Sequence, residues 1–174
     1  MLALRDYVIA IDPGTTESGI CIVSSKDYMP LAFAKVKNED VPYWIQCKNP
    51  RMGNYLHIEA VIERMQGNYL HVGSDVFLTC EWIGRFDVEL HDLGITKREY
   101  IQRREEYQIL CGKEYTRNDK GIRQSLVDRF AYGEPNYGKG KKEAPGWFYG
   151  FSADVWQAYG IAVAYIDKCK VMEG

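Results

Sequence analysis

Residues 7–14, which read YVIAIDPG, decide the fold of this chain. The run from Tyr7 to Ile11 is apolar and rich in β-branched side chains, a composition typical of a buried strand. Pro13 and Gly14 are residues at which strands stop, so this strand is expected to end at Asp12. The sequence therefore predicts an acidic side chain at the tip of a central strand.

Four further strands are predicted after this one. Apolar runs at 18–23 and 31–36 follow the first strand, and three sequential strands of this length favour a meander. Residues 57–63 predict a fourth strand, which places Glu63 near its end, and a further strand is expected around residues 100–104.

Helical spacing of apolar residues dominates the remainder of the chain. The last helix is expected to begin at Ser152, a good N-cap residue, which puts Asp154 in its first turn. Strands that come first and then alternate with helices predict an α/β fold, with a mixed five-stranded sheet and helices on both faces. The other expected helices are a short one within 37–56 and longer ones at 72–87, 105–111 and 119–131.

Residues 132–150 predict a mobile loop. The segment contains five glycines, two prolines and three lysines. Glycine and proline interrupt regular structure, so this composition favours turns over a helix or strand.

Length and composition limit the classes of protein. The chain has 174 residues, of which 46% are hydrophobic and 26% charged, and this suits one folded domain spanning 1–174. No run of 18 apolar residues is present, so we expect no membrane association and a cytoplasmic location. Five cysteines without a CxxC pair argue against a disulfide framework or a zinc ribbon.

Charge is divided unevenly along the chain. Residues 1–94 contain 8 Lys/Arg and 13 Asp/Glu, a net charge of −5, and residues 95–150 contain 12 and 8, a net charge of +4. A basic segment in an otherwise acidic protein indicates either a face that binds a polyanion or a solvated surface.

Three acids lie where predicted elements end or begin: Asp12, Glu63 and Asp154. Each alone is compatible with a solvated or capping carboxylate. If they converge at one sheet edge, their mutual repulsion requires a cation, and oxygen ligands without His or Cys favour Mg²⁺ or Mn²⁺.

Three blocks of the sequence, AIDPGTTESGICIV, VIERMQ and SADVWQAYGIAVAY, resemble the signature blocks of the RuvC family of Holliday-junction resolvases and occur in the family's order. Between them, ILCGKEYTRNDKGIRQSLVDRF resembles the family's glycine turn and lysine-bearing helix. The resemblance implies a ribonuclease H-like fold, and the short, tyrosine-rich chain is similar to phage-encoded members, which act in the host cytoplasm.

The resemblance also implies a mechanism. Asp12 matches the first catalytic aspartate, Glu63 the catalytic glutamate and Asp154 the first acid of the last helix. In the family, these ligands hold two Mg²⁺ or Mn²⁺ ions that activate water and stabilise the leaving 3′ oxygen, leaving a 5′-phosphate. A homodimer would cut a four-way junction by two symmetric nicks, and the apolar side of the 72–87 helix is either the dimer interface or ordinary core packing.

The chain departs from the family at several positions. Gln157 stands where a fourth catalytic acid is usual, and its neutral amide should weaken metal binding. Gln66 stands where the family has a wedge aromatic, with Tyr69 the nearest ring. Lys120 matches a family lysine near the scissile phosphate. Arginines near this segment complete the expected DNA-binding set: Arg103, Arg104 and Arg123.

The sequence is also compatible with other functions. Gln157 favours a branched-DNA-binding protein with weakened catalysis, and the missing wedge aromatic suits a nuclease with relaxed choice of branched DNA or RNA–DNA hybrid. Residues 12–16 also resemble the phosphate-binding turn of sugar kinases and actin-like ATPases, but 174 residues cannot supply the two domains that those proteins need.

Overall fold

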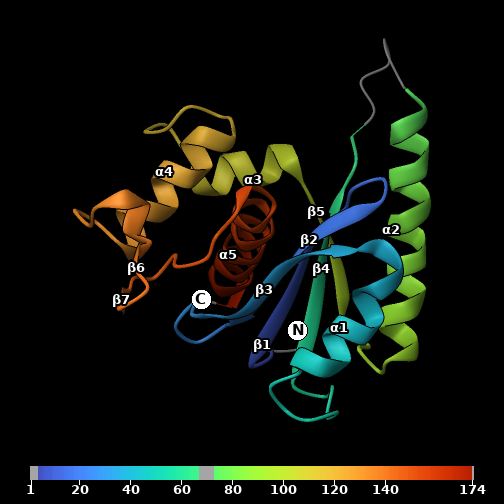
Figure 1. The fold of residues 1–174 in the computed structure, drawn as a ribbon. Coiled ribbons are helices and arrows are strands. Elements are labelled where there is room, and N and C mark those ends of the chain that lie inside the picture. Colours follow the sequence, from blue (N-terminus) through green and yellow to red (C-terminus); the bar gives the residue numbers. More distant parts are fainter. Residues whose placement is uncertain (1–3, 67–72, 174) are drawn as a thin grey trace.

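The computed structural model describes residues 4–66 and 73–173 (Figure 1). Its centre is a five-stranded sheet in the order β3-β2-β1-β4-β5. The first three strands form an antiparallel meander, and β4 and β5 run parallel to β1. The strands are β1 (Tyr7–Asp12), β2 (Glu17–Ser24), β3 (Pro30–Lys37), β4 (Ile58–Arg64) and β5 (Arg98–Gln102).

Helices cover both faces of this sheet (Figure 1). On one face lie α1 (Val41–Lys48) and α2 (Ser74–Asp92), and on the other lie α3 (Arg103–Leu110), α4 (Asp119–Phe130) and α5 (Ala153–Glu173). The predicted α/β fold class, with a mixed five-stranded sheet and helices on both faces, is confirmed. Within the described ranges, no helix has the length and apolar character needed to cross a membrane.

Alternation along the strands decides which face each side chain occupies. Val8 and Ala10 pack in the core on the α5 side, whereas Ile9 and Ile11 pack in the core beneath α1 and α2. The next residue in this pattern is Asp12, so its side chain belongs to the α5 face. The same alternation on β4 places Glu63 on that face, because Val61 lies there.

Two predicted boundaries differ from the structure. The expected strand at 100–104 is β5, which ends at Gln102, so Arg103 and Arg104 begin α3 instead of continuing a strand. The expected helix at 72–87 is α2, which continues to Asp92. The apolar residues of α2 do not all face the core, because Phe77 is 62% exposed.

The loop at 132–150 is packed more closely than its composition predicts. It contains a short 3-10 helix, Asn136–Gly138, and a small hairpin of β6 (Gly140–Lys141) and β7 (Ala144–Pro145). Phe148 is fully buried against aromatic rings of α5, and the Lys139 ammonium donates a hydrogen bond to the carbonyl of Phe151. Apolar anchoring therefore outweighs the local preference of glycine and proline for irregular structure.

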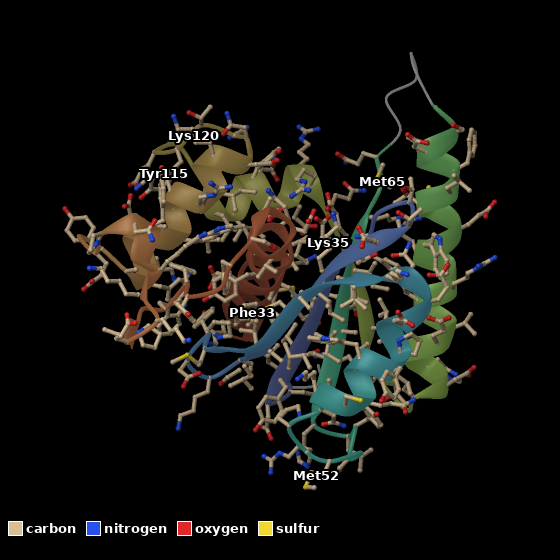
Figure 2. All side chains as sticks on the ribbon, viewed as in Figure 1. Phe33, Lys35, Met52, Met65, Tyr115 and Lys120 are labelled. Atoms are coloured by element: carbon tan, nitrogen blue, oxygen red, sulfur yellow. The ribbon has the colours of Figure 1, made fainter. Side chains whose placement is uncertain are left out.

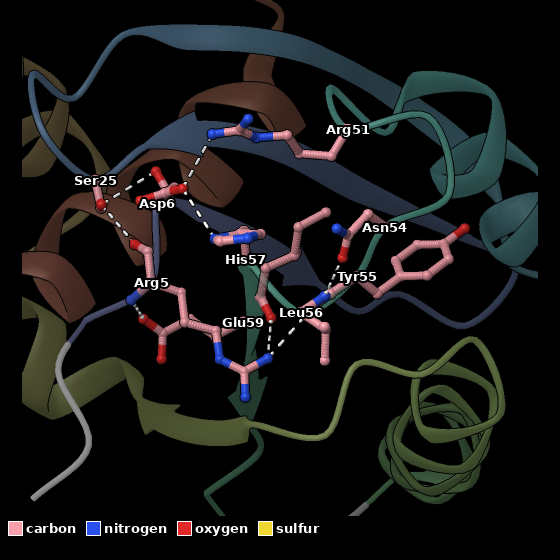
Figure 3. A network of polar contacts seen from close by, with 10 residues as sticks. Arg5, Asp6, Ser25, Arg51, Asn54, Tyr55, Leu56, His57 and Glu59 are labelled. Carbon is pink, nitrogen blue, oxygen red and sulfur yellow. Dashed lines mark hydrogen bonds and ion pairs between the residues drawn. The ribbon is translucent and has the colours of Figure 1, made fainter.

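A polar network holds the first residues of β1 and β4, at the end of the sheet opposite to Asp12 (Figure 3). Glu59 on β4 is fully buried and accepts hydrogen bonds from the Arg5 amide and the Tyr165 hydroxyl. The Lys97 ammonium lies 2.6 Å from the same carboxylate. A buried acid with this many donors is satisfied, so we assign Glu59 a structural role.

Gly19 on β2 is required by the close approach of α5. A β-carbon at this position would lie 2.4 Å from the carbonyl oxygen of Asp154. We expect Gly19→Ala to lower the free energy of unfolding by about 1–3 kcal/mol, because α5 must shift away from the sheet. Urea denaturation measures this change.

Gly84→Ala is the matched control for that substitution. Gly84 lies on the exposed side of α2, where a β-carbon meets nothing within 4 Å. Alanine should there raise the unfolding free energy by about 0.5–1 kcal/mol, because it favours the helix. Equal effects at the two positions would show that the contact between β2 and α5 is not the cause.

Candidate active site

Asp12 and Glu63 lie side by side at the ends of two neighbouring strands. Strands β1 and β4 are parallel, and Ile11 pairs with Ile62, so the following residues on the α5 face are adjacent. Their carboxyl groups are close enough for a hydrogen bond, which acts to raise the pKa of Glu63 and to lower that of Asp12. Two carboxyl groups can share a hydrogen bond only when one of them carries a proton.

Burial disfavours the charged forms of both acids. It raises the pKa of Glu63 to about 9, and the hydrogen bond to Asp12 adds to this rise. Burial also raises the pKa of Asp12, although the hydrogen bond from Glu63 and the nearby Arg103 guanidinium act in the opposite direction. The pair therefore holds a proton near neutral pH when no metal is bound.

The raised pKa of Glu63 predicts a dependence of stability on pH. Between the ordinary pKa of about 4.5 and the folded value of about 9, the folded chain holds a proton on Glu63 that the unfolded chain releases. The contribution of Glu63 to stability must therefore fall as pH rises through this window. In EDTA, Glu63→Gln should weaken that fall by up to about 1 kcal/mol per pH unit, measured by urea unfolding at pH 5, 6.5 and 8.

The exposed Glu99 provides the control for this prediction. Glu99→Gln should leave the pH dependence as in the wild type, because an exposed carboxyl loses little hydration on folding. Parallel stability curves for Glu63→Gln and the wild type would contradict the assigned burial effect.

Asp154 joins this pair from the first turn of α5. Its backbone packs on Gly19, the residue that pairs with Asp12 across β1 and β2, and its charge adds to the raised pKa of Asp12. Lys35 of β3, labelled in Figure 2, approaches to 3.2 Å of the Asp154 carboxylate. The Lys35 ammonium also lies 3.5 Å from Glu17. Asp12 and Glu63 are thus adjacent, and Asp154 lies near them at the start of α5 with its carboxylate paired to Lys35.

Arg103 lies at the centre of the cluster. As the first residue of α3, it directly follows β5, the parallel neighbour of β4. Its Nε is 2.9 Å from Glu63 Oε1, and its Nη2 is 3.8 Å from Asp12 Oδ1. Arg103 was expected among the DNA-binding residues; in this structure its guanidinium contacts the acids, and its binding to DNA stays a prediction.

Glu106 is a fourth acid that the sequence pattern missed. It lies three residues after Arg103 on α3, and its Oε2 is 3.1 Å from Arg103 Nη1. The side chain is fully buried, and its Oε1 has no hydrogen-bond partner among the described residues. Burial raises the pKa of Glu106 to about 7. The i,i+3 spacing from an arginine was the one available signal.

Gln157 and Gly160 of α5 complete the surroundings of Glu106. The Gln157 side-chain oxygen accepts a hydrogen bond from Arg103 Nη1. A β-carbon on Gly160 would lie 2.6 Å from Glu106 Oε1, so glycine makes room for the buried carboxyl. Gln157 therefore binds the guanidinium in this structure and occupies the side of α5 that carries Asp154.

The remaining predicted residues are distributed around the cluster. Lys120 and Arg104 are exposed, and Lys120 lies in the first turn of α4 (Figure 2). The neighbouring Asp119 contributes to the raised pKa values of Asp12 and Glu106. Arg123 instead packs on α5, with its guanidinium 5.5 Å from the Trp156 ring centroid.

Gln66 and Tyr69, the two positions near the expected wedge, follow β4. The exposed Gln66 donates a hydrogen bond to the side chain of Gln102, at the end of the adjacent strand β5. Tyr69 lies outside the described residues.

The cluster has the chemistry of a site for hard divalent cations but is not arranged around one. Asp12, Glu63 and Asp154 offer only oxygen donors, which suit Mg²⁺ or Mn²⁺. Across residues 4–66 and 73–173, however, no three His, Cys, Asp or Glu side chains are grouped as a ready metal site. Arg103 and Lys35 instead supply the positive charge. The oxygen donors fit a divalent metal ion, provided that the side chains of Arg103 and Lys35 move away.

This sheet order, with a long helix across one face, is that of the ribonuclease H-like fold. Two solved structures share it. The chain is 15% identical to Thermus thermophilus RuvC in complex with a Holliday junction substrate, covering 97% of this chain and 96% of that one, with a TM-score of 0.63. It is 16% identical to another T. thermophilus RuvC structure, covering 95% and 96%, with a TM-score of 0.65.

Comparison of sequences adds no family. The chain matches no family model and no curated protein sequence. At 15–16% identity, the likeness to RuvC is one of fold.

Proposed function

We propose that this chain is a metal-dependent endonuclease that cuts four-way and other branched DNA by paired nicks. The proposal rests chiefly on the adjacency of Asp12 and Glu63 on the α5 face of a ribonuclease H-like sheet, with Asp154 near them at the start of α5. The same fold in a RuvC protein bound to a Holliday junction substrate supports the choice of DNA as substrate.

Under this proposal, the three acids hold two Mg²⁺ or Mn²⁺ ions. Bound ions would supply an activated water and stabilise the leaving 3′ oxygen, giving a 5′-phosphate. Asp12 is the central ligand because it contacts Glu63 and lies next to the start of α5. Glu63 must lose its proton before it binds a cation, so metal binding should release protons.

Basic side chains near the cluster are proposed to hold the DNA backbone. Lys120 and Arg104 are exposed on the two helices that follow β5. A groove of about 610 Å³ also lies between β3 and α1 and is lined in part by Lys35 and by the acids Glu17 and Asp40. Lys37 and Lys48 line it together with the 70% exposed Tyr43. Lysines next to an exposed ring suit phosphates and unpaired bases.

A two-fold dimer would present two such sites to a four-way junction. The outer side of α2 carries exposed apolar residues, including Phe77, Leu78 and Val88. We propose this side as the dimer contact, and light scattering of the purified chain measures the oligomeric state.

A binding protein with weak or lost cleavage is the second candidate. Gln157 in place of a fourth acid, and Arg103 in contact with Glu63 and Asp12, both favour it. Under this alternative, the chain recognises branched DNA without cutting it.

One assay distinguishes these functions. A synthetic mobile four-way junction is compared with linear duplex, flap and RNA–DNA hybrid substrates in Mg²⁺, Mn²⁺ or EDTA, and binding is recorded in the same samples. Paired nicks in the junction that require metal support the resolvase. Tight junction binding without nicks in either metal would refute the enzyme and favour the binding protein, whereas cleavage of the hybrid or flap indicates relaxed specificity.

A further inference from the structure

We propose that Arg103 competes with divalent cations for the carboxylates of Asp12 and Glu63, so that a metal ion enters only when the guanidinium moves away. This inference rests on the proposed function, because it concerns how the metal site of that nuclease is filled. It assigns Arg103 a regulatory role at the acids, in place of a contact to DNA.

The first support is the position of the guanidinium. Its Nε is 2.9 Å from Glu63 Oε1, and its Nη2 is 3.8 Å from Asp12 Oδ1. A cation bound between these carboxylates would need the oxygens that Arg103 contacts. The guanidinium and the metal ion are both positive and repel each other, so they cannot both bind these oxygens tightly at the same time.

The second support is the charge of the cluster. When ionised, Asp12, Glu63 and Glu106 bring three negative charges, and Arg103 returns one positive charge, which leaves −2. Buried carboxylates with this deficit must either take up protons or gain a cation. Arg103 thus neutralises these acids only in part, so the ionised cluster still attracts a cation.

The third support is that Arg103 has another place to bind. Its Nη1 contacts Glu106 Oε2 at 3.1 Å and donates a hydrogen bond to Gln157, and neither residue belongs to the proposed ligand set. The Arg103 side chain is 27% exposed, whereas Glu106 is fully buried. The guanidinium can therefore leave Glu63 and Asp12 toward solvent and remain attached to Glu106.

Calorimetric titration of the full chain with Mn²⁺ tests the inference without any measurement of cleavage. We expect Arg103→Gln to lower the Kd for Mn²⁺ by about tenfold, because the change frees the oxygens and removes a competing charge. Arg104→Gln is the matched control, since it removes an exposed positive charge one residue away and frees no carboxylate. Its Kd for Mn²⁺ should stay within about twofold of the wild type.

A double variant tests whether the guanidinium blocks the carboxylate oxygens without changing the net charge of the cluster. It also avoids leaving a buried charge that could unfold the chain. Arg103→Gln with Glu106→Gln removes both partners of the buried pair, so neither is left as an unpaired buried charge. The formal charge of the cluster remains −2, because one positive and one negative charge are lost together. We expect this variant to bind Mn²⁺ at least about threefold more tightly than the wild type. Circular dichroism verifies that each variant is folded.

The possible failures are distinguishable. If the wild type binds Mn²⁺ and neither variant binds it more tightly, the competition is refuted while the proposed nuclease stands. If neither the wild type nor the variants bind Mn²⁺, both proposals fail. Binding by Arg103→Gln alone would be the strongest support, because it would show that the guanidinium blocks an otherwise competent site.

Discussion

Replacement of Asp12 by asparagine is expected to slow junction cleavage by about a thousandfold or more while leaving junction binding within about threefold of the wild type. Asparagine has nearly the same shape but lacks the negative charge, and Asp12 is the acid that contacts Glu63 and adjoins both Arg103 and the start of α5. The exposed basic residues that are proposed to bind DNA are unchanged. Single-turnover cleavage in Mn²⁺ and fluorescence anisotropy in EDTA measure the two effects.

Asp27→Asn is the control for this substitution. Asp27 lies at the exposed turn between β2 and β3 and outside the acid cluster. It should change neither cleavage nor binding. Undiminished cleavage by Asp12→Asn would remove Asp12 from the mechanism, and loss of binding together with cleavage would indicate a folding defect, which thermal melting can detect.

Phe148→Ala is expected to lower the free energy of unfolding by about 3–5 kcal/mol. Phe148 is fully buried, and its ring centroid lies 4.4 Å from that of Trp156, 5.2 Å from that of Phe151 and 5.8 Å from that of Tyr159. Removal of the ring leaves a cavity between the 132–150 segment and α5. Urea denaturation gives the loss of stability, and limited proteolysis shows whether the segment is cut more readily.

The adjacent Tyr149 is the matched control, because it is 42% exposed. Tyr149→Ala should cost less than about 1 kcal/mol. If the two alanine variants were equally stable, the packing of this segment on α5 would not contribute to folding.

Local sequence was sufficient for the α/β class and for the placement of three acids at element boundaries. The apolar run before Asp12, the run before Glu63 and the Ser152 start before Asp154 each mark an element boundary within a few residues, and these boundaries agree with the structure. Such signals are reliable because strand period, turn residues and helix caps act between near neighbours. The catalytic and metal-binding roles of these acids stay predictions until cleavage and metal binding are measured.

The sequence was a poor guide where long-range packing decides the outcome. Arg103 was expected in a strand, but it begins α3 and contacts Glu63. Glu106 gave no signal of burial, because it lies in a charged stretch whose neighbours indicate a solvated helix. The 132–150 segment, rich in glycine, was expected to be mobile, yet Phe148 anchors it.

The sequence by itself thus determined the order of strands and helices, the α/β class and which acids stand at element ends, because these depend on interactions between residues close in the chain. Only the tertiary structure decided which charges meet. Arg103 reaches Asp12, Glu63 and Gln157 because parallel pairing of β1, β4 and β5 and the packing of α5 bring four distant segments together. Buried charges must find partners across such distances, and no local pattern records which partner that is.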